Sequence, residues 1–406
     1  MEQKKKMPLA AQIFIALIAG VILGLLMQNH AETAEAYIKP FGTIFLNLVK
    51  FIVVPIVLFS IMAGILSMRD IRKLGSIGIT TLVYYLLTTA FAVTIGMAGG
   101  KLFSGFFPAL ATTDLSYEAA AETSFMDTLV NIFPSNFIAP MSSATMLQVI
   151  FMALLLGFAI ILVGKEAEPV VTGVNSLNVV FMKCMDMILR LSPIGVFCLI
   201  CPVVAANGKA ILGSLAMVLL AAYICYVVHV LVVYSLTVRT LGGMSPLEFF
   251  KKEMPAMIFA FSSASSVGTL PINLEGCERM GVPKEIASFV LPLGATINMD
   301  GTAIYQGVCA IFIASCYGID LTFGQMLTIV LTATLASIGT AGVPGAGMVM
   351  LAMVLTSVGL PVDGIALVAG VDRIFDMGRT AVNITGDASC AVVVANMEKK
   401  KELRKR

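Results

Sequence analysis

Two segments in the C-terminal third of the chain place charged and amide side chains inside apolar sequence. The first reads TINMDGT and contains Asn298 and Asp300, and the second reads VDRIFDMGRTAVNITGD. In a helix with 100° per residue, most polar side chains of the second segment line one face, which predicts one wall of a polar cavity. The residues on this face are Asp372, Asp376, Arg379, Asn383 and Asp387.

The charges in these segments do not balance, because four carboxylates accompany only two guanidinium groups, those of Arg373 and Arg379. At about 3 kcal/mol for each charge on a membrane-insertion scale, six unpaired charges would cost roughly 18 kcal/mol, so they must be paired or bound to ions. We predict that mobile cations bind the two excess carboxylates. Asp300 and Asp387, with nearby amide and backbone carbonyl oxygens, offer the hard ligands that suit Na⁺, and a proton on one carboxylate is the alternative.

Arg379 is the candidate for binding an anionic group, because its planar guanidinium matches a carboxylate and keeps its charge at every relevant pH. Asp376 lies one turn away and could hold an ammonium group. Helix N-termini near Ser266 and Gly342 could bind a second carboxylate through free backbone amides. An ammonium group and two carboxylates describe an acidic amino acid.

An internal ion pair is the alternative interpretation of Arg379, since Asp376 lies at the i,i+3 spacing. Arg373 argues against this pair, because it can itself partner Asp376 and leave Arg379 unpaired until a substrate binds. Asp372 can equally pair with Arg373. The spacing does not decide between these arrangements.

The elements that position these residues belong to a membrane protein. The chain has 406 residues, 58% hydrophobic and 12% charged, and its mean hydropathy of +0.96 exceeds that of water-soluble domains. One crossing takes about 20 apolar residues, so the length allows about eight or nine crossings and no soluble domain. Basic residues fall in alternate loops, which predicts cytoplasmic termini, and the net charge of +2 does not favour nucleic-acid binding. Eight scattered cysteines predict no disulfide framework, and His229, alone in an apolar segment, does not look catalytic.

We expect an all-α polytopic protein with eight transmembrane helices and two re-entrant helical hairpins. The hairpins are expected within 252–279 and 323–360, because glycine- and serine-rich interruptions are tolerated in a membrane only where protein or a wet cavity surrounds them. Hairpin, helix, hairpin, helix forms an inverted repeat that is common in secondary transporters. The expected helices are 9–27, 41–68, 77–103, a broken fourth between 127 and 162, 170–205, 211–238, 286–317 and 365–394.

Four motifs occur in a fixed order, namely SSASSVGTLP, NMDGTAIYQG, SIGTAGVPGAG and DMGRTAVNITGD. With them the whole chain resembles the dicarboxylate/amino acid:cation symporters, a family that includes prokaryotic glutamate/aspartate transporters and mammalian excitatory amino acid transporters. The resemblance implies a homotrimer that works as an elevator. Scaffold segments 1–76 and 106–209 would stay fixed, while a transport domain of 77–105 (helix 3), 210–244 (helix 6) and 245–406 (both hairpins with helices 7 and 8) would move.

The resemblance also implies roles for individual residues. It places Arg379 on the side-chain carboxylate of the substrate and Asp376 on the amino group. The implied substrate-binding residues are Ser265, Ser266, Thr302, Val343, Gly347, Asp376, Arg379, Thr380 and Asn383. The implied cation positions are Gly294, Asn298, Asn383 and Asp387 for one site, Thr296, Ser337, Ile338 and Thr340 for a second, and Tyr85, Thr88, Thr89, Asn298 and Asp300 for a third.

The chain departs from the family pattern in the first hairpin and in helix 7. Ala264 and Met377 stand where archaeal and mammalian members respectively have an arginine, and Arg373 is our candidate for that role. Gln306 stands where mammalian members have a glutamate linked to proton coupling, so we do not expect proton transport through that residue.

These observations predict a Na⁺-coupled symporter that takes up L-aspartate or L-glutamate across a prokaryotic inner membrane, in contact with lipid. The alternatives within the family are a proton-coupled glutamate/aspartate symporter and, less favoured, a C4-dicarboxylate or neutral amino acid carrier. A gated ion channel would need a continuous wet path, which two closed hairpins do not suggest. An enzyme is not expected, because no Ser-His, H-x-x-x-H or paired catalytic aspartate pattern appears.

Overall fold

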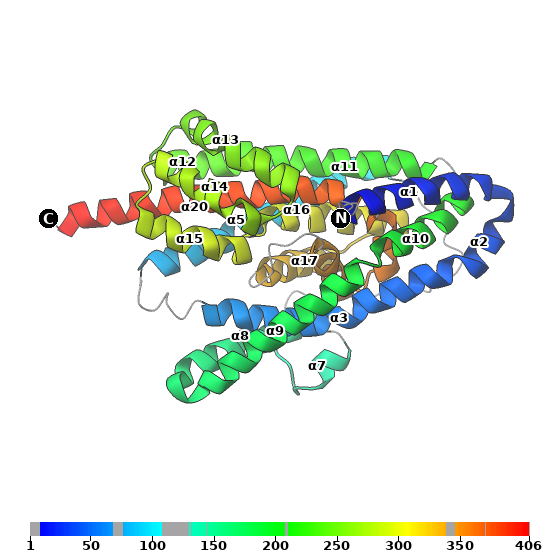
Figure 1. Cartoon of the computed structure of the whole chain (residues 1–406), viewed down its shortest axis with the longest axis horizontal. Helices are drawn as coiled ribbons and strands as arrows, with labels where there is room; N and C mark the ends of the chain where they lie inside the picture. The colour runs from blue at the N-terminus through cyan, green and yellow to red at the C-terminus, as the bar shows by residue number, and fades with distance from the viewer. Residues whose placement is uncertain are drawn as a thin grey trace, which may run out of the picture.

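The computed structural model describes residues 9–67, 76–107, 130, 132–143, 145–207, 210–337, 346–369 and 371–405. Within these ranges every regular element is a helix, which confirms the all-α expectation (Figure 1). Val343, Ile338 and Thr340, which were assigned roles at the second hairpin, lie outside the described residues.

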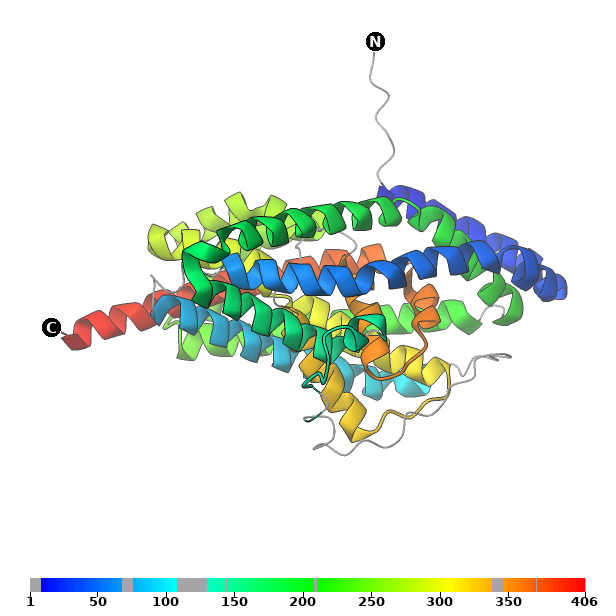
Figure 2. The ribbon, with the colours of Figure 1, turned by 90° about the horizontal axis from the view of Figure 1, so that it is seen from below.

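The N-terminal half forms one group of packed helices. The long helix α3 packs against α8, α9 and α10, and α1 packs along α10. Figure 2 shows α3 running beside the other members of this group. The helices are α1 (Leu9–Leu26), α2 (Ala31–Tyr37), α3 (Lys39–Ser67), α7 (Ala139–Ser142), α8 (Met146–Val163), α9 (Glu168–Leu189) and α10 (Ser192–Asn207).

One expected helix in this half is in fact two. The segment 170–205 divides into α9 and α10, with the break at Arg190 and Leu191. Pro193 explains the position of the break, because proline has no N–H to continue a helix but is tolerated in the first turn of a new one.

The second group of helices surrounds the last helix of the chain. It contains α5 (Ser76–Phe103), α11 (Ala210–Val228), a π-helix (His229–Tyr234), α12 (Ser235–Thr240), α13 (Pro246–Ser263), α14 (Ser266–Arg279), α15 (Lys284–Ile297), α16 (Asp300–Cys316), α17 (Phe323–Ala336), α18 (Ala346–Ser357), α19 (Ile365–Ala369) and α20 (Asp372–Lys405). The helices α5, α11, α13, α14, α15 and α16 all pack against α20. Figure 1 shows the C-terminal end of α20 projecting from the molecule at the end opposite α2. Short 3₁₀ turns lie at Gln28–His30, Ser104–Phe106, Gly164–Ala167 and Val362–Gly364.

The chain reverses direction within the predicted first interruption. Ala264 has a left-handed backbone with φ of 50°, which ends α13, and Ser265 follows in an extended conformation. The hydroxyl oxygen of Ser265 accepts a hydrogen bond from the amide of Gly268 and so caps the N-terminus of α14. The arms α13 and α14 pack against each other and against α20, so this segment is a helical hairpin.

A second correction concerns the helix expected over 286–317. The structure divides it into α15 and α16, because Asn298 has an extended backbone with φ −85° and ψ 102°. The break leaves free carbonyl groups at the end of α15 and free amide groups at the start of α16. Both helices pack against α20, and the amide of Gly301 in the first turn of α16 donates to Oδ1 of Asn383 on α20.

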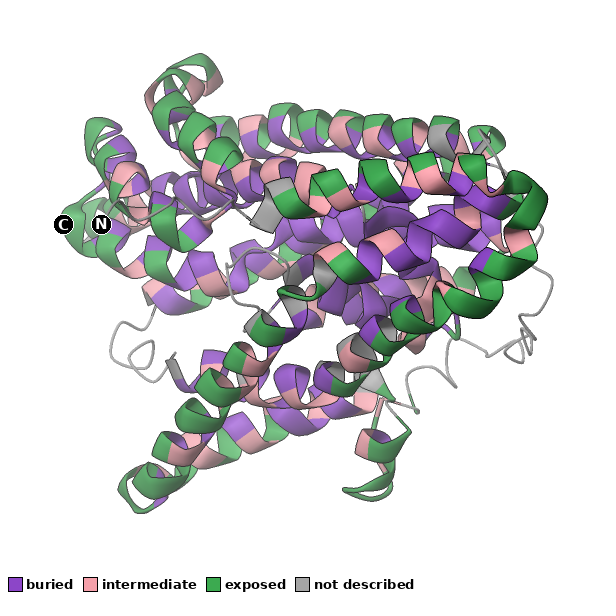
Figure 3. Ribbon diagram, turned by 45° about the vertical axis from the view of Figure 1, so that its right-hand side comes forward, coloured by how far each residue is buried: buried purple, intermediate pink, exposed green. Residues whose placement is uncertain are grey.

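Burial separates an inner core from an outer, apolar surface. Among the described residues, four helical stretches are long and apolar enough to span a membrane, or five if the bent pair α1–α2 counts as one. Within the stretch Lys284–Cys316, 94% of an apolar 18-residue window is buried, whereas the corresponding window of Gln148–Met185 is only 28% buried. Figure 3 shows the same contrast between buried inner and exposed outer helix faces. The protein is therefore a multi-pass membrane protein, and its eight crossings stay a prediction.

Candidate functional site

Arg379 lies on α20 at the centre of the second helix group, and its side chain is 3% exposed. Its Nε donates to Oδ1 of Asp376 at 2.8 Å, while Nη1 and Nη2 donate to the two carboxylate oxygens of Asp372 at 3.2 and 3.4 Å. Our expectation that Arg379 stays unpaired until substrate binds is therefore wrong for this state. The spacings i,i+3 and i,i+7 put both carboxylates on the face of α20 that carries the arginine.

Arg373 reaches in the other direction. Its Nη1 lies 3.3 Å from Oδ2 of Asp376, and its Nη2 donates to the carbonyl oxygen of Ser263 at 3.1 Å. Ser263 is the last residue of α13, so Arg373 brings a positive charge to the tip of the first hairpin beside Ala264. The two aspartates and two arginines of this cluster cancel in charge.

A narrow compartment encloses the Arg379 guanidinium. Its central carbon lies 4.9 Å from the centre of the Tyr305 ring, a cation–π contact. Gly347 of α18 lies on another side, and a Cβ added there would collide with the guanidinium. A larger residue at position 347 would therefore require the guanidinium to move. No sequence signal pointed to Tyr305.

Asp387 lies in a second buried compartment, where acceptors outnumber donors. The Nδ2 group of Asn298 donates to Oδ1 of Asp387 and to the backbone oxygen of Asn383, each at 2.8 Å. The Oδ1 atom of Asn298 is buried and has no hydrogen-bond partner among the described residues. A Cβ on Gly294 would collide with Asp387 and with the Tyr85 hydroxyl, so the backbone of α15 approaches the carboxylate closely.

This donor set fits a small hard cation. A buried carboxylate, an unpaired amide oxygen and nearby backbone carbonyls are the oxygen ligands that such ions prefer. The structure therefore brings together the four residues assigned to the first cation position. A group of three or more histidine, cysteine or acidic side chains suited to other metals does not occur in the described part of the chain.

Asp300 is fully buried at the start of α16, and protein donors occupy both of its oxygens. The hydroxyl of Thr89 donates to Oδ1 at 2.7 Å, and the hydroxyl of Tyr234 donates to Oδ2 at 2.8 Å. The Nε2 atom of His229 lies 3.1 Å from the same Oδ2. His229, which has no ligand-type residue near it in sequence, therefore acquires a carboxylate partner through tertiary packing. Sequence could not reveal the contact, because the residues are 71 positions apart and a π-helix, whose hydrogen bonds run from i to i+5, orients His229 and Tyr234.

The other two hydroxyls assigned to the third cation position contact backbone instead. Tyr85 donates to the carbonyl of Val290 at 3.1 Å, and Thr88 donates to the carbonyl of Tyr85 at 3.2 Å. Their lone pairs stay available to a cation, but Asp300 itself already has three protein contacts. Of the second cation position only Thr296 and Ser337 are described, and both donate to carbonyls of their own helices.

The remaining candidate residues lie around the helix break. Asn383 accepts a hydrogen bond from the amide of Gly301 at 2.8 Å, while its Nδ2 lies 3.4 Å from the sulfur of Met299. The hydroxyl of Thr302 lies 3.8 Å from the same sulfur. Met299, which we did not single out, thus lies between two predicted substrate contacts. Two further candidates, Ser266 and Thr380, are buried at the start of α14 and beside Arg379.

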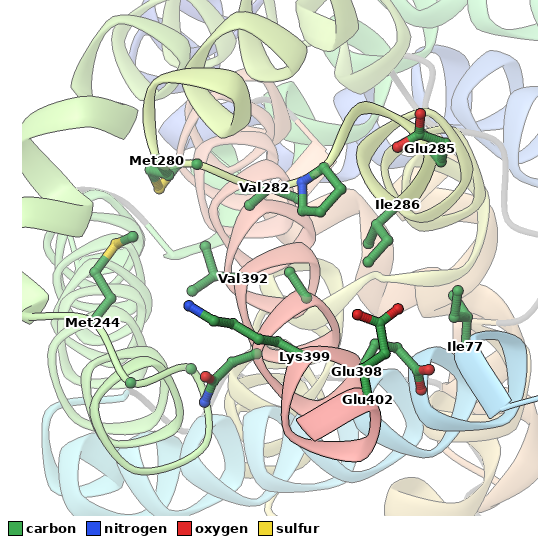
Figure 4. A pocket seen from close by; sticks show the side chains of 16 residues that line it. Ile77, Met244, Met280, Val282, Glu285, Ile286, Val392, Glu398, Lys399 and Glu402 are labelled. Atoms are coloured by element: carbon green, nitrogen blue, oxygen red, sulfur yellow. The ribbon is translucent and has the colours of Figure 1, made fainter. Parts of the chain in front are cut away.

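A cavity of about 570 Å³ lies elsewhere in the molecule, near the C-terminal part of α20 (Figure 4). Glu285, Glu398, Lys399 and Glu402 are among its lining side chains. None of the predicted substrate or cation residues lines this cavity.

A multi-pass helical protein whose ion pairs and unpaired acceptors meet at broken helices belongs to the class of membrane transporters. The sequence model of the sodium:dicarboxylate symporter family matches residues 9–397, and the chain belongs to this family. It is 38% identical over 416 residues to the proton/glutamate-aspartate symporter of Escherichia coli strain K12, covering 98% of this chain and 95% of that protein. The family consists of transporters rather than enzymes.

Two further relatives differ in the ions and substrates that their names state. The proton/sodium-glutamate symport protein of Bacillus caldotenax is 36% identical over 403 residues, covering 97% of this chain and 95% of that protein. C4-dicarboxylate transport protein 1 of Ralstonia nicotianae is 32% identical over 403 residues, covering 97% of this chain and 94% of that protein.

Proposed function

We propose that the protein is a secondary symporter that couples Na⁺ entry to uptake of L-aspartate or L-glutamate across a prokaryotic inner membrane. The observation that carries this proposal is the division of buried charge into two compartments. Two aspartates and two arginines balance each other around Arg379, whereas Asp387 lies beside an amide oxygen without a partner among the described residues. The first compartment suits a zwitterion with an extra carboxylate, and the second suits a cation.

Substrate binding at Arg379 follows from exchange of one carboxylate for another. The side-chain carboxylate of the amino acid takes the place of Asp372 on the guanidinium fork, which keeps the two parallel hydrogen bonds. Asp372 is then left buried and negative, so it needs a new cation. The ammonium group of the substrate supplies this cation, with Asp376 beside it. A dicarboxylate without an amino group leaves Asp372 unpaired, which favours amino acids over C4-dicarboxylates.

The Na⁺ ion binds beside Asp387 and neutralises it when the carrier is loaded. Asn298 and Asn383 link the two compartments, because Asn383 contributes its backbone oxygen to the Asn298 amide and lies on the same α20 face as Arg379. Ion binding thereby holds the backbone in place at the break between α15 and α16, next to which the substrate binds. Coupling is a difference in substrate affinity between the ion-bound and ion-free states.

The division of the chain into a scaffold and a moving transport domain also enters this proposal. The helices α1, α2, α3, α8, α9 and α10 pack chiefly on one another, and α5, α11 and α13–α16 pack around α20. This pattern supports an elevator movement of the second group. We propose that three copies of the scaffold assemble as a homotrimer, with both termini in the cytoplasm.

Uptake of labelled aspartate into proteoliposomes tests the function. Inward Na⁺ gradients should drive accumulation, unlabelled aspartate or glutamate should compete, and succinate should compete far less. Accumulation that is equally fast without Na⁺ would contradict the assignment of Na⁺ as the coupling ion. Competition by succinate as strong as that by aspartate would contradict the assignment of amino acids as the substrates.

A further inference from the structure

We propose that Glu253 of the first hairpin binds a proton that travels with the amino acid. Glu253 lies on α13, outside the candidate substrate and cation residues, and it is fully buried. Both carboxylate oxygens lack a hydrogen-bond partner among the described residues. This inference rests on the proposed transport function and adds a second coupled ion to it.

The packing of the hairpin provides a socket for this side chain. Oε2 of Glu253 lies 2.9 Å from the point where a Cβ on Gly276 would be, so the glycine of α14 leaves the room that the carboxyl occupies. The arm α13 also packs against α20. A carboxyl group enclosed between three packed helices has no route to bulk water while the hairpin is closed.

The neighbouring cations have other partners. Arg279 of α14 donates from Nη2 to the carbonyl oxygen of Lys252 at 3.2 Å and lies 3.9 Å from Glu275, with no hydrogen bond to Glu253. Lys252 itself pairs with Glu248 at 2.6 Å.

The remaining titratable groups around Glu253 add no positive charge. Asp387 lies on α20 and Cys277 on α14, the two helices that pack against α13, and either side chain would add negative charge, not positive, if it ionised. Arg239, on the neighbouring helix α12, is exposed and makes no hydrogen bond to it. An ionised Glu253 would therefore be a buried anion without a hydrogen-bond donor among the described residues, because the nearby Arg279 donates to the Lys252 carbonyl instead, and such an anion is unfavourable.

The neutral acid is the form that fits the closed hairpin, and the proton is held as long as the arms stay packed. We place the route of proton release at Arg279. Its Nη2 lies 3.8 Å from the position that a Cβ on Gly276 would take, next to which the Glu253 carboxyl also lies, and its side chain is 46% exposed to solvent. When the arms separate, the proton goes to water and the Arg279 guanidinium turns from the Lys252 carbonyl to the new carboxylate. Rebinding of a proton from the other side restores the closed hairpin.

The test uses proteoliposomes of the full-length protein with a pH-sensitive dye inside and the membrane voltage clamped. Wild-type vesicles should acidify internally as a Na⁺ gradient drives aspartate uptake. Glu253→Gln copies the neutral acid, so it should keep aspartate exchange within about twofold and lose the acidification. The matched control is Glu278→Gln, the same change at an exposed position of α14, which should keep both activities.

The outcomes separate this proposal from the transport function. Acidification retained in Glu253→Gln, or aspartate uptake by the wild type without any acidification, would overturn the assignment of Glu253 and leave the symporter intact. Wild-type vesicles that move no aspartate would refute the function and the proton site with it. If Glu253→Gln does not yield folded protein, Glu253→Met gives a neutral side chain with the same expected loss, and Glu253→Asp should retain acidification.

Discussion

Replacing Asp372 with asparagine tests how the site selects an amino acid. In the structure this carboxylate forms both parallel hydrogen bonds to the Arg379 fork, and we propose that it holds the substrate ammonium once it is displaced. The Asp372→Asn change keeps the shape of the side chain but removes its charge. The change weakens the internal pair with Arg379, which should raise the affinities for aspartate and succinate alike. The ratio of the two affinities therefore measures only the contact with the substrate ammonium group.

The magnitude follows from the bond that is lost. A hydrogen bond to a charged group contributes roughly 1.5–3 kcal/mol, and each 1.4 kcal/mol is a tenfold change in affinity. Asp372→Asn should therefore lower the preference for aspartate over succinate by about ten- to a hundredfold.

Isothermal titration calorimetry with each ligand at saturating Na⁺ measures this ratio. Asp320→Asn, which removes an exposed carboxylate from the loop after α16, is the matched control and should leave the ratio unchanged. An Asp372→Asn protein that discriminates as strongly as the wild type would refute the proposed role of this residue.

Two other substitutions follow from close contacts. Gly347→Ala places a methyl group against the buried Arg379 guanidinium and should reduce the affinity for aspartate at least about tenfold. The control Gly213→Ala, whose methyl group meets open space, should leave the affinity unchanged. Equal aspartate affinities of the two variants in calorimetry would contradict the closed compartment around Arg379. Tyr234→Phe removes a donor from the Asp300 carboxylate and should lower stability by roughly 1–3 kcal/mol in a thermal-shift assay, against no change for the exposed Tyr37→Phe.

Helix positions were largely predictable because hydropathy and the pattern of basic loops constrain them directly. The breaks were less predictable. Pro193 lies in the first turn of α10, whereas Pro55 lies inside the continuous helix α3, so a proline alone does not predict a break. At Asn298 the backbone leaves the helix inside an apolar run, and the stabilising contacts come from α20, which lies far away in sequence.

In the candidate site, too, features set by neighbouring residues in the sequence were predictable, whereas contacts between distant segments were not. A count of charges predicted two carboxylates in excess, and pairing in the structure leaves Asp300 and Asp387 outside the arginine cluster. The partner of Arg379 was not predictable, because Asp372 and Asp376 share one helical face. The contact of His229 with Asp300 and the isolation of Glu253 among the described residues arise only from tertiary packing.

The most direct test of the central claim, that a buried excess of carboxylate binds Na⁺, is the affinity for aspartate as a function of Na⁺ concentration at fixed pH and ionic strength. Calorimetry on the wild type should show an affinity that rises steeply with Na⁺ and stays flat when K⁺ or choline replaces it. The same steepness should be reduced in Asp387→Asn. An aspartate affinity that is equal in Na⁺, K⁺ and choline would contradict the account.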